Sequence, residues 1–236
     1  MSFRIWLPVL ALSAAVQAQS PPFDTLTPEQ QAAVKRGEPV QVLQTVSTSS
    51  WPRSIVYVFI DATPEESAAV LSDYEIQSSF VPHMKSSKII ARHGANDTDV
   101  EYVIDIPVFP DERSVSRQWV SGANGEYQVH WKTVFADSLK PDGSRTVGLA
   151  TFLPFTNAAG HPGTLVIHDQ TVVPNSVFAS VPFVKRKGIQ VSIESAMATA
   201  RQVEMERSKE PKQLAAQVRR FREALAAPRD SAKVIR

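Results

Sequence analysis

The feature that most constrains the fold is a series of strand-like segments, of which those from Ser87 onward follow one another with no helical segment between them. In Glu126–Phe135, the clearest of them, apolar residues such as Tyr127, Val129 and Trp131 alternate with polar ones, which is the period of a half-buried strand. Parallel strands need a long crossover between them, so this series predicts an antiparallel sheet, with Trp131 facing the core. The predicted strands are Val40–Val46, Ile55–Ile60, Ser87–Arg92, Asp99–Ile106, Arg113–Val120, Glu126–Phe135, Thr146–Phe155 and Gly163–Val173.

Helix signals stand before and within this series. Thr63 and Glu66 have the spacing of a capping box, and the proline after Thr63 suits the first helical position. The same signature at Thr27–Gln30 predicts a short helix that braces the N-terminus. We expect two short helices between Thr63 and the Val81–Pro82 corner, and we expect the Asp73 carboxylate to cap the turn between them by accepting backbone N–H groups.

The period changes after the last strand. The segment from Phe183 to about Arg207 predicts one long helix with a thin apolar stripe rich in small residues, so it either lies close to the sheet or leaves room beneath it. Pro211 ends it, and Lys212–Ala227 predicts a separate amphipathic helix. Its basic residues could meet anionic lipid headgroups or form a solvated face. These residues are Arg219, Arg220 and Arg222.

The first residues have the layout of a secretory signal peptide. Arg4 precedes a short apolar run, and the small-residue ending at Ala18 is typical of a cleavage site. A retained, membrane-anchoring N-terminus is the alternative. Removing residues 1–18 leaves equal numbers of basic and acidic residues, so the charge does not favour nucleic acid as a partner. The chain has no cysteine, which excludes disulfides and thiolate metal sites and suits a bacterial periplasm.

The sequence contains none of the common catalytic motifs. Serine-hydrolase, zincin, P-loop and dinucleotide-binding signatures are missing, and the five histidines fall on separate predicted elements. We therefore expect neither a metal nor a cofactor. His168 and Asp169 in the last strand are the best acid–base candidates, because only one of two adjacent strand residues can face the core. The alternative is that this residue faces solvent or only satisfies a buried partner.

One segment also resembles a known family. The run VFIDATPEESAAVLSDYEIQSSFVPHMKSSKII is similar to the strand, capped helix and aromatic–proline corner of the START-like (SRPBCC) superfamily, in its polyketide cyclase/dehydrase and coenzyme Q-binding branch. The resemblance covers about Val40 to Arg207. It implies an α+β helix-grip fold, in which a curved antiparallel sheet of about six to eight strands wraps on a long C-terminal helix, with two short helices after the first strands.

The resemblance further implies an apolar ligand pocket between the sheet and the long helix. By position, its ligand-binding residues would be Phe80, Tyr102, Trp119, Trp131, Phe152, Ile167, Phe178 and Met197. The chain then divides into a signal peptide (1–18), a linker with a short helix (19–39), the START-like domain (40–207) and a basic amphipathic C-terminal extension (208–236).

Three functions are compatible with these features. The first is a periplasmic or secreted binding or carrier protein, monomeric, whose apolar ligand (a lipid, isoprenoid or quinone) enters at the rim between Phe80–Met84 and the long helix. The second is a cyclase- or dehydrase-type enzyme that acts on a hydrophobic substrate in the same pocket. The third is an interaction module whose Lys212–Ala227 helix contacts a membrane or a protein. Acid–base candidates for the second are His168, Asp169, Asp105 and Tyr102.

Overall fold

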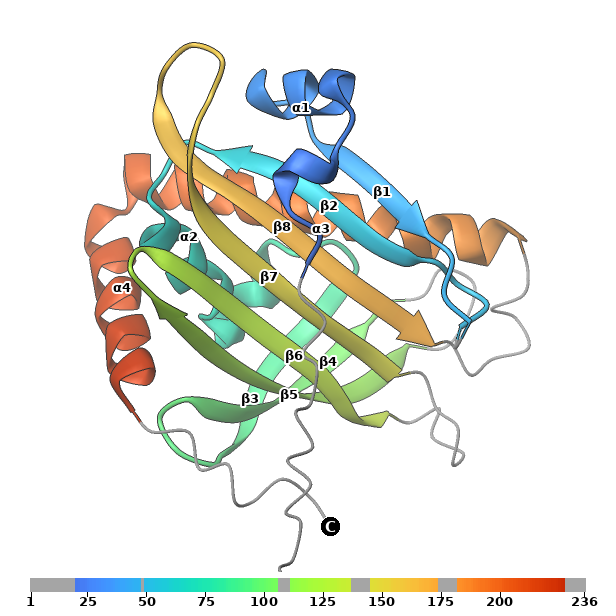
Figure 1. The fold of residues 1–236 in the computed structure, drawn as a ribbon. Helices are drawn as coiled ribbons and strands as arrows, with labels where there is room; N and C mark the ends of the chain where they lie inside the picture. Colours follow the sequence, from blue (N-terminus) through green and yellow to red (C-terminus); the bar gives the residue numbers. More distant parts are fainter. Residues whose placement is uncertain (1–19, 48, 106–110, 137–144, 174–181, 228–236) are drawn as a thin grey trace, which may run out of the picture.

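Eight strands in the described part of the chain form one antiparallel sheet, in the order β1-β2-β8-β7-β6-β5-β4-β3. The computed structural model describes residues 20–47, 49–105, 111–136, 145–173 and 182–227. Figure 1 shows a curved sheet with α2, α3 and α4 on one side and α1 on the other. The elements are η1 (Phe23–Thr25), α1 (Pro28–Lys35), β1 (Val40–Gln44), β2 (Arg53–Ile60), α2 (Pro64–Leu71), η2 (Tyr74–Ser79), β3 (Met84–Arg92), β4 (Asp97–Ile104), β5 (Glu112–Ala123), β6 (Glu126–Ala136), β7 (Arg145–Thr156), β8 (Pro162–Val173), α3 (Pro182–Lys209) and α4 (Pro211–Ala226).

The strand pairing confirms the predicted helix-grip architecture. The β1–β2 hairpin joins β8, and β8 continues through β7, β6, β5 and β4 to β3 at the other edge. Register shifts interrupt the ladder between Val115 and Ser116 on β5 and between Ile89 and Ala91 on β3. Such bulges bend a strand and increase its twist, so they help to curve this half of the sheet.

Both predicted capping boxes are present. In α2 the Glu66 N–H donates to Thr63 Oγ1 over 3.2 Å, and the Thr63 N–H donates to Glu66 Oε2 over 2.9 Å. The same exchange joins Thr27 and Gln30 at the start of α1. The predicted cap at Asp73 is wrong, because its side chain makes no capping hydrogen bond to η2 and accepts instead from two side chains of α4.

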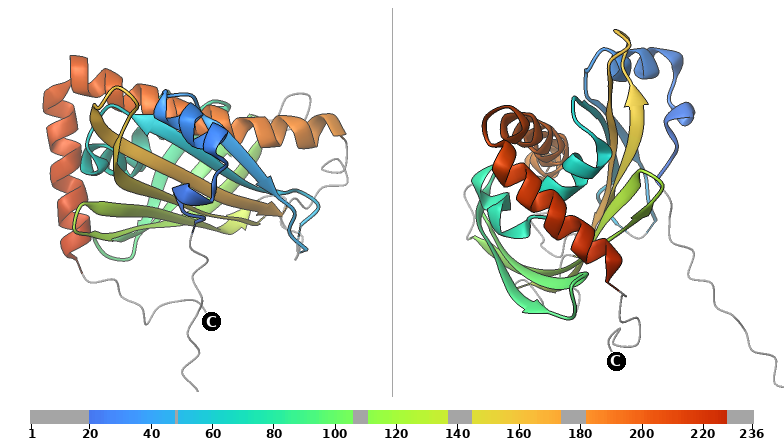
Figure 2. Two further views of the ribbon diagram at one scale, coloured as in Figure 1. Left: turned by 45° about the horizontal axis from the view of Figure 1, so that its top comes forward. Right: turned by 90° about the vertical axis from the view of Figure 1, so that its left-hand side faces the viewer.

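The C-terminal third forms two helices that meet at Pro211. The long helix α3 lies along the concave side of the sheet, where it contacts β2 and α2, and α4 then turns away from it to cover one end of the domain (Figure 2). Pro211 occupies the first turn of α4, where its missing N–H leaves no intrahelical bond unmade. The extension predicted after Pro211 is therefore a helix that packs on α2.

Two apolar cores lie on opposite faces of the sheet. The concave core joins Val56, Phe152 and Val166 of the sheet to α2, α3 and α4. The convex core lies beneath η1 and α1, where Ile55 and Leu165 pack with residues of these two helices. Along β8, the even-numbered residues therefore face the concave side and the odd-numbered ones face the convex side.

Two predictions fall outside the described residues, namely the signal peptide at 1–18 and the assignment of Phe178 to the pocket. Within the described ranges, none of the helices combines the length and the apolar character that crossing a bilayer requires.

Candidate functional site

The concave face of the sheet changes in burial from one end to the other. At the α2 end, the inward side chains of Val129, Ala150 and Phe152 are fully buried. Further along the same strands, the inward-facing positions are only partly buried, although they lie in the same layer. We call this less buried part the α3 face, because Gln170 Nε2 donates to Ser192 Oγ of α3 over 2.6 Å. It comprises Trp131, Gly148, His168 and Gln170.

Trp131 and His168 meet on the α3 face. Their ring centroids are 4.9 Å apart with an interplanar angle of 34°. Gly148 makes this contact possible, because a Cβ at that position would lie 2.2 Å from ring atoms of Trp131. The sequence prediction that Trp131 faces inward is confirmed.

His168 has an unusual environment for a histidine. Its Nδ1 is buried and has no hydrogen-bond partner among the described residues. Burial lowers the pKa of the imidazole to about 4, an effect that the negative charge of the neighbouring Asp169 only partly offsets. The ring is therefore neutral near pH 7, and its Nδ1 has hydrogen-bonding capacity that no described residue uses.

A short network of buried polar side chains lies deeper on the concave face. The Tyr102 hydroxyl donates to Gln77 Oε1 over 2.7 Å and accepts from Gln118 Nε2 over 2.9 Å. Gln77 in turn donates to the Leu71 carbonyl over 2.7 Å, which ties the network to the end of α2. Burial raises the pKa of Tyr102 well above its ordinary value, so the phenol keeps its proton and holds η2 against the sheet.

The structure separates the predicted ligand-binding residues into two groups. Tyr102, Trp131 and Phe152 lie on the concave face. Trp119 and Ile167 lie on the convex face, where Trp119 stacks on His130 with a centroid distance of 4.9 Å and Ile167 packs in the core beneath α1. Neither of these two side chains can therefore line a space between the sheet and α3. Phe80, just after η2, and Met197 on α3 are both partly buried.

The acid–base candidates do not converge. Asp169 points to the convex face, where its carboxylate accepts from Arg53 Nε over 2.7 Å. Asp105 is half exposed and lies 3.3 Å from Lys85 Nζ. His168 therefore has neither of the two predicted carboxylates beside it. Within the described ranges, no three His, Asp or Glu side chains are grouped so that they could hold a metal ion.

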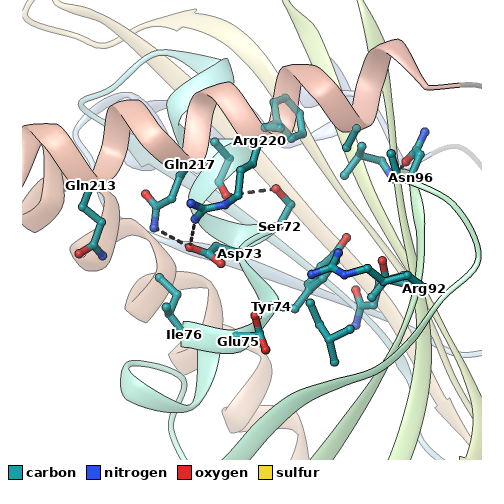
Figure 3. A pocket seen from close by; sticks show the side chains of 18 residues that line it. Ser72, Asp73, Tyr74, Glu75, Ile76, Arg92, Asn96, Gln213, Gln217 and Arg220 are labelled. Atoms are coloured by element: carbon teal, nitrogen blue, oxygen red, sulfur yellow. Dashed lines mark hydrogen bonds and ion pairs between the residues drawn. The ribbon is translucent and has the colours of Figure 1, made fainter.

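A second feature, which the sequence did not predict, is a pocket of about 520 Å³ at the α2 end of the domain (Figure 3). Its floor is formed by β3, β4 and β5, one wall by η2, and its roof by α4. We call it the α4 pocket. The lining residues come from segments far apart in the sequence, so no local pattern predicts the pocket. The apolar stripe of the last helix is the one sequence feature that indicates that this helix folds back. The lining residues include Tyr74, Ile89, Thr98, Gln118, Gln217 and Phe221.

Helix α4 is attached by apolar contacts and by charges. Phe221 is 2% exposed, and its ring makes a T-shaped contact with that of Tyr127 at a centroid distance of 5.4 Å. Arg220 donates to Asp73 over 2.7 Å, and Arg222 forms a two-bond pair with Glu65. Two of the three arginines that the sequence suggested for a lipid surface are therefore paired with carboxylates of the same domain.

Comparisons with known proteins agree with this architecture. No protein-family model matches the sequence, and no curated protein is similar enough to match it. Among solved structures, human StAR-related lipid transfer protein 5 superposes with a TM-score of 0.58 at 8% identity, over 71% of this chain and 82% of its own. A fragment of the STAR-related lipid transfer protein from Xanthomonas axonopodis gives 0.57 at 15% identity, over 70% and 93%.

Human STARD10 is a third similar structure, with a TM-score of 0.55 at 13% identity over 84% of this chain and 86% of its own. The chain therefore has the START-like helix-grip fold, as its sequence predicted. The α3 face occupies the side of the sheet that the long helix covers.

Proposed function

We propose that the protein binds and carries an apolar ligand between the α3 face and helix α3. The observation that carries this proposal is the change in burial along the concave face. Phe152 and Ala150 are buried completely, whereas Trp131 and His168 in the same layer remain partly accessible. An aromatic ring that stays accessible inside a curved sheet favours an apolar guest, whose affinity would come from burying that surface.

The free polar atom of His168 adds a requirement for the ligand. A buried polar atom without a partner costs about 1 to 3 kcal/mol, and a ligand group that bonds to it removes this cost. The neutral imidazole can bond to a hydroxyl or a carbonyl. We therefore propose a ligand with a long apolar part and one such group, a description that includes isoprenoid alcohols, quinones and neutral lipids.

The similar folds support a carrier. Two of the solved structures with this fold are described as StAR-related lipid transfer proteins. The cyclase-type alternative is less favoured, because a histidine with a pKa of about 4 is a weak base near pH 7 and the two candidate carboxylates point elsewhere.

We also propose that the carrier works in the periplasm or outside the cell, on the basis of the signal-peptide layout of residues 1–18. Fractionation of the native host tests this directly. We expect the protein in the periplasmic or secreted fraction, with a mass that corresponds to cleavage near Ala18. A full-length protein in the cytoplasm would contradict the proposal.

Native mass spectrometry of protein purified from its own host, followed by organic extraction, tests the carrier function. The matched variants are Ile193→Trp, which adds bulk on the inner side of α3, and Val147→Trp, which adds the same side chain at an exposed position of β7. We expect an apolar molecule with the unmodified protein and with Val147→Trp, and a large loss with Ile193→Trp. A ligand-free protein, or equal retention by both variants, would overturn the proposal.

A further inference from the structure

The α4 pocket is distinct from the α3 face. No described residue of α3 or of β6, β7 and β8 lines it, and its roof comes entirely from the helix after Pro211. The Tyr102 network lies beside it, since Gln118 lines the pocket and donates to Tyr102. A ligand of the α4 pocket would therefore contact different residues from a ligand of the α3 face.

Three polar side chains that line the α4 pocket have hydrogen-bonding capacity that no described residue uses. Tyr74 is 8% exposed and Thr98 is 3% exposed, and neither hydroxyl has a hydrogen-bond partner among the described residues. Gln217, 1% exposed, donates to Asp73 and Glu206, but its Oε1 is buried and unpartnered. Native proteins pair nearly all buried polar groups, so the buried Gln217 Oε1, together with two lining hydroxyls that are free to bond, favours a polar ligand in this pocket.

The charges of the α4 pocket define which polar ligand fits. The guanidinium of Arg92 is exposed at the end of β3, lies near Tyr74 and has no ion-pair partner in the described part of the chain (Figure 3). The Arg220 charge is already neutralised by Asp73 at 2.7 Å. Arg92 is thus the cation that remains available, and guanidinium groups bind carboxylate and phosphate oxygens with two parallel hydrogen bonds.

Tyr74 complements this cation as a donor. Burial raises the pKa of its phenol well above the ordinary value, so the O–H keeps its proton under physiological conditions. The Thr98 hydroxyl can donate as well. Two carboxylates line the pocket: Asp73 is paired with Arg220, whereas Glu75 is exposed on η2 and would repel an anion. The charge of Asp97, next to Thr98 on β4, also acts on Tyr74. The Glu75 carboxylate provides a test, because its removal should strengthen the binding of an anion.

Apolar side chains form another part of the lining. Ile76, Ile89, Val120 and Phe221 contribute side chains from η2, the floor and the roof. A volume of about 520 Å³ lies within the range of small-molecule sites. The pocket therefore offers an apolar surface together with one cation and two hydroxyl donors.

We propose that the α4 pocket is a second binding site, for an amphipathic molecule whose carboxylate or phosphate group bonds to Arg92, Tyr74 and Thr98 while its apolar part lies against Ile89 and Phe221. A free acid and the phosphate of a lipid headgroup share this chemistry. The pocket would then either bind a free small acidic amphiphile or attach the protein to a lipid through its phosphate.

Isothermal titration of the full-length protein tests this site with three probes of equal chain length: decanoate, decyl phosphate and uncharged decan-1-ol. We expect both anions to bind and the alcohol to bind at least about tenfold more weakly, as expected when a charge-assisted hydrogen bond is lost. Stronger binding of decanoate points to a free acid, and stronger binding of decyl phosphate points to a phosphate headgroup. Equal binding of all three probes would overturn the proposal.

Four variants test whether the anion binds in the α4 pocket. Arg92→Gln and Tyr74→Phe should each weaken anion binding, Arg92→Gln by about tenfold or more. Glu75→Gln should strengthen it. Arg219→Gln, which removes an exposed arginine of α4 that does not line the pocket, is the matched control and should change nothing. Weakening by Arg219→Gln equal to that by Arg92→Gln would show that binding follows only the general positive charge.

The proposals for the α3 face and for the α4 pocket can be refuted independently of each other. Ile193→Trp, designed to block the α3 face, should leave decanoate binding unchanged. Loss of decanoate binding in Ile193→Trp together with normal binding in Arg92→Gln would assign the anion to the α3 face and refute the second site. Circular dichroism of each variant confirms that the fold is intact.

Discussion

The attachment of helix α4 depends mainly on one buried ring, and this can be tested. Phe221 is 2% exposed, and its ring makes a T-shaped contact with that of Tyr127, at a centroid distance of 5.4 Å and an interplanar angle of 74°. Replacing a buried phenylalanine with alanine costs about 3 to 5 kcal/mol. Phe221 also lines the α4 pocket, where water can fill the vacated volume, so we expect a value near the lower limit, about 3 kcal/mol.

The cost of Phe221→Ala should appear first as local opening of α4, because this helix is the last element described and contacts the body mainly through α2. Native-state hydrogen exchange measures this opening. A loss of about 3 kcal/mol corresponds to exchange about 100-fold faster for the amides of residues 211–226. The amides of β7 and β8 should keep their protection.

The Arg222→Gln variant tests how much the ion pairs of α4 contribute to its attachment. Arg222 is exposed, and its pair with Glu65 is screened by solvent, so the amides of α4 should exchange only slightly faster in this variant. Faster exchange in Arg222→Gln than in Phe221→Ala would show that ion pairs hold the helix. That result would refute the packing argument.

Two further predictions concern the α3 face. Burial lowers the pKa of His168 in the folded protein to about 4, below its value in the unfolded chain. The unfolded state therefore binds more protons as the pH falls. The neutral His168 contributes its full stabilisation above about pH 6.5, and this contribution is lost as the pH falls towards 4. Urea unfolding across this window should show a decrease of up to about 3 kcal/mol that is absent in His168→Leu, and an equal decrease in that variant would contradict the assignment. Gly148→Ala should displace the Trp131 ring, since the new Cβ would lie 2.2 Å from it, and lower the free energy of unfolding by about 1 to 3 kcal/mol. Tryptophan fluorescence checks this change, and an unaltered spectrum and stability would show that the ring has room to move.

Local signals predicted the elements of the fold well. The capping boxes at Thr27 and Thr63 depend on side chains three residues apart, so the sequence alone contains the interaction. The period of two in β6 likewise placed Trp131 on the correct face. Such patterns, together with the START-like resemblance, sufficed for the sheet and for the long helix.

Faces and distant partners were harder to predict. Trp119 and Ile167 lie one position away from the inward residues Gln118 and His168, and a shift of one residue moves a side chain to the other face of a sheet. Asp73 looked like a local cap, but its partners Gln217 and Arg220 are more than 140 residues away in the sequence. The α4 pocket was missed for the same reason, since its roof exists only when α4 folds back on α2.

The central claim is that an apolar ligand lies against the α3 face, and intermolecular nuclear Overhauser effects test it most directly. The probe is farnesol, an isoprenoid alcohol, added to protein with labelled methyl groups and histidine rings. We expect contacts from the probe to the Ile193 methyl groups and to the ring of His168. Contacts confined to Val120 and Ala224 in the α4 pocket, or no contacts with either site, would contradict the account.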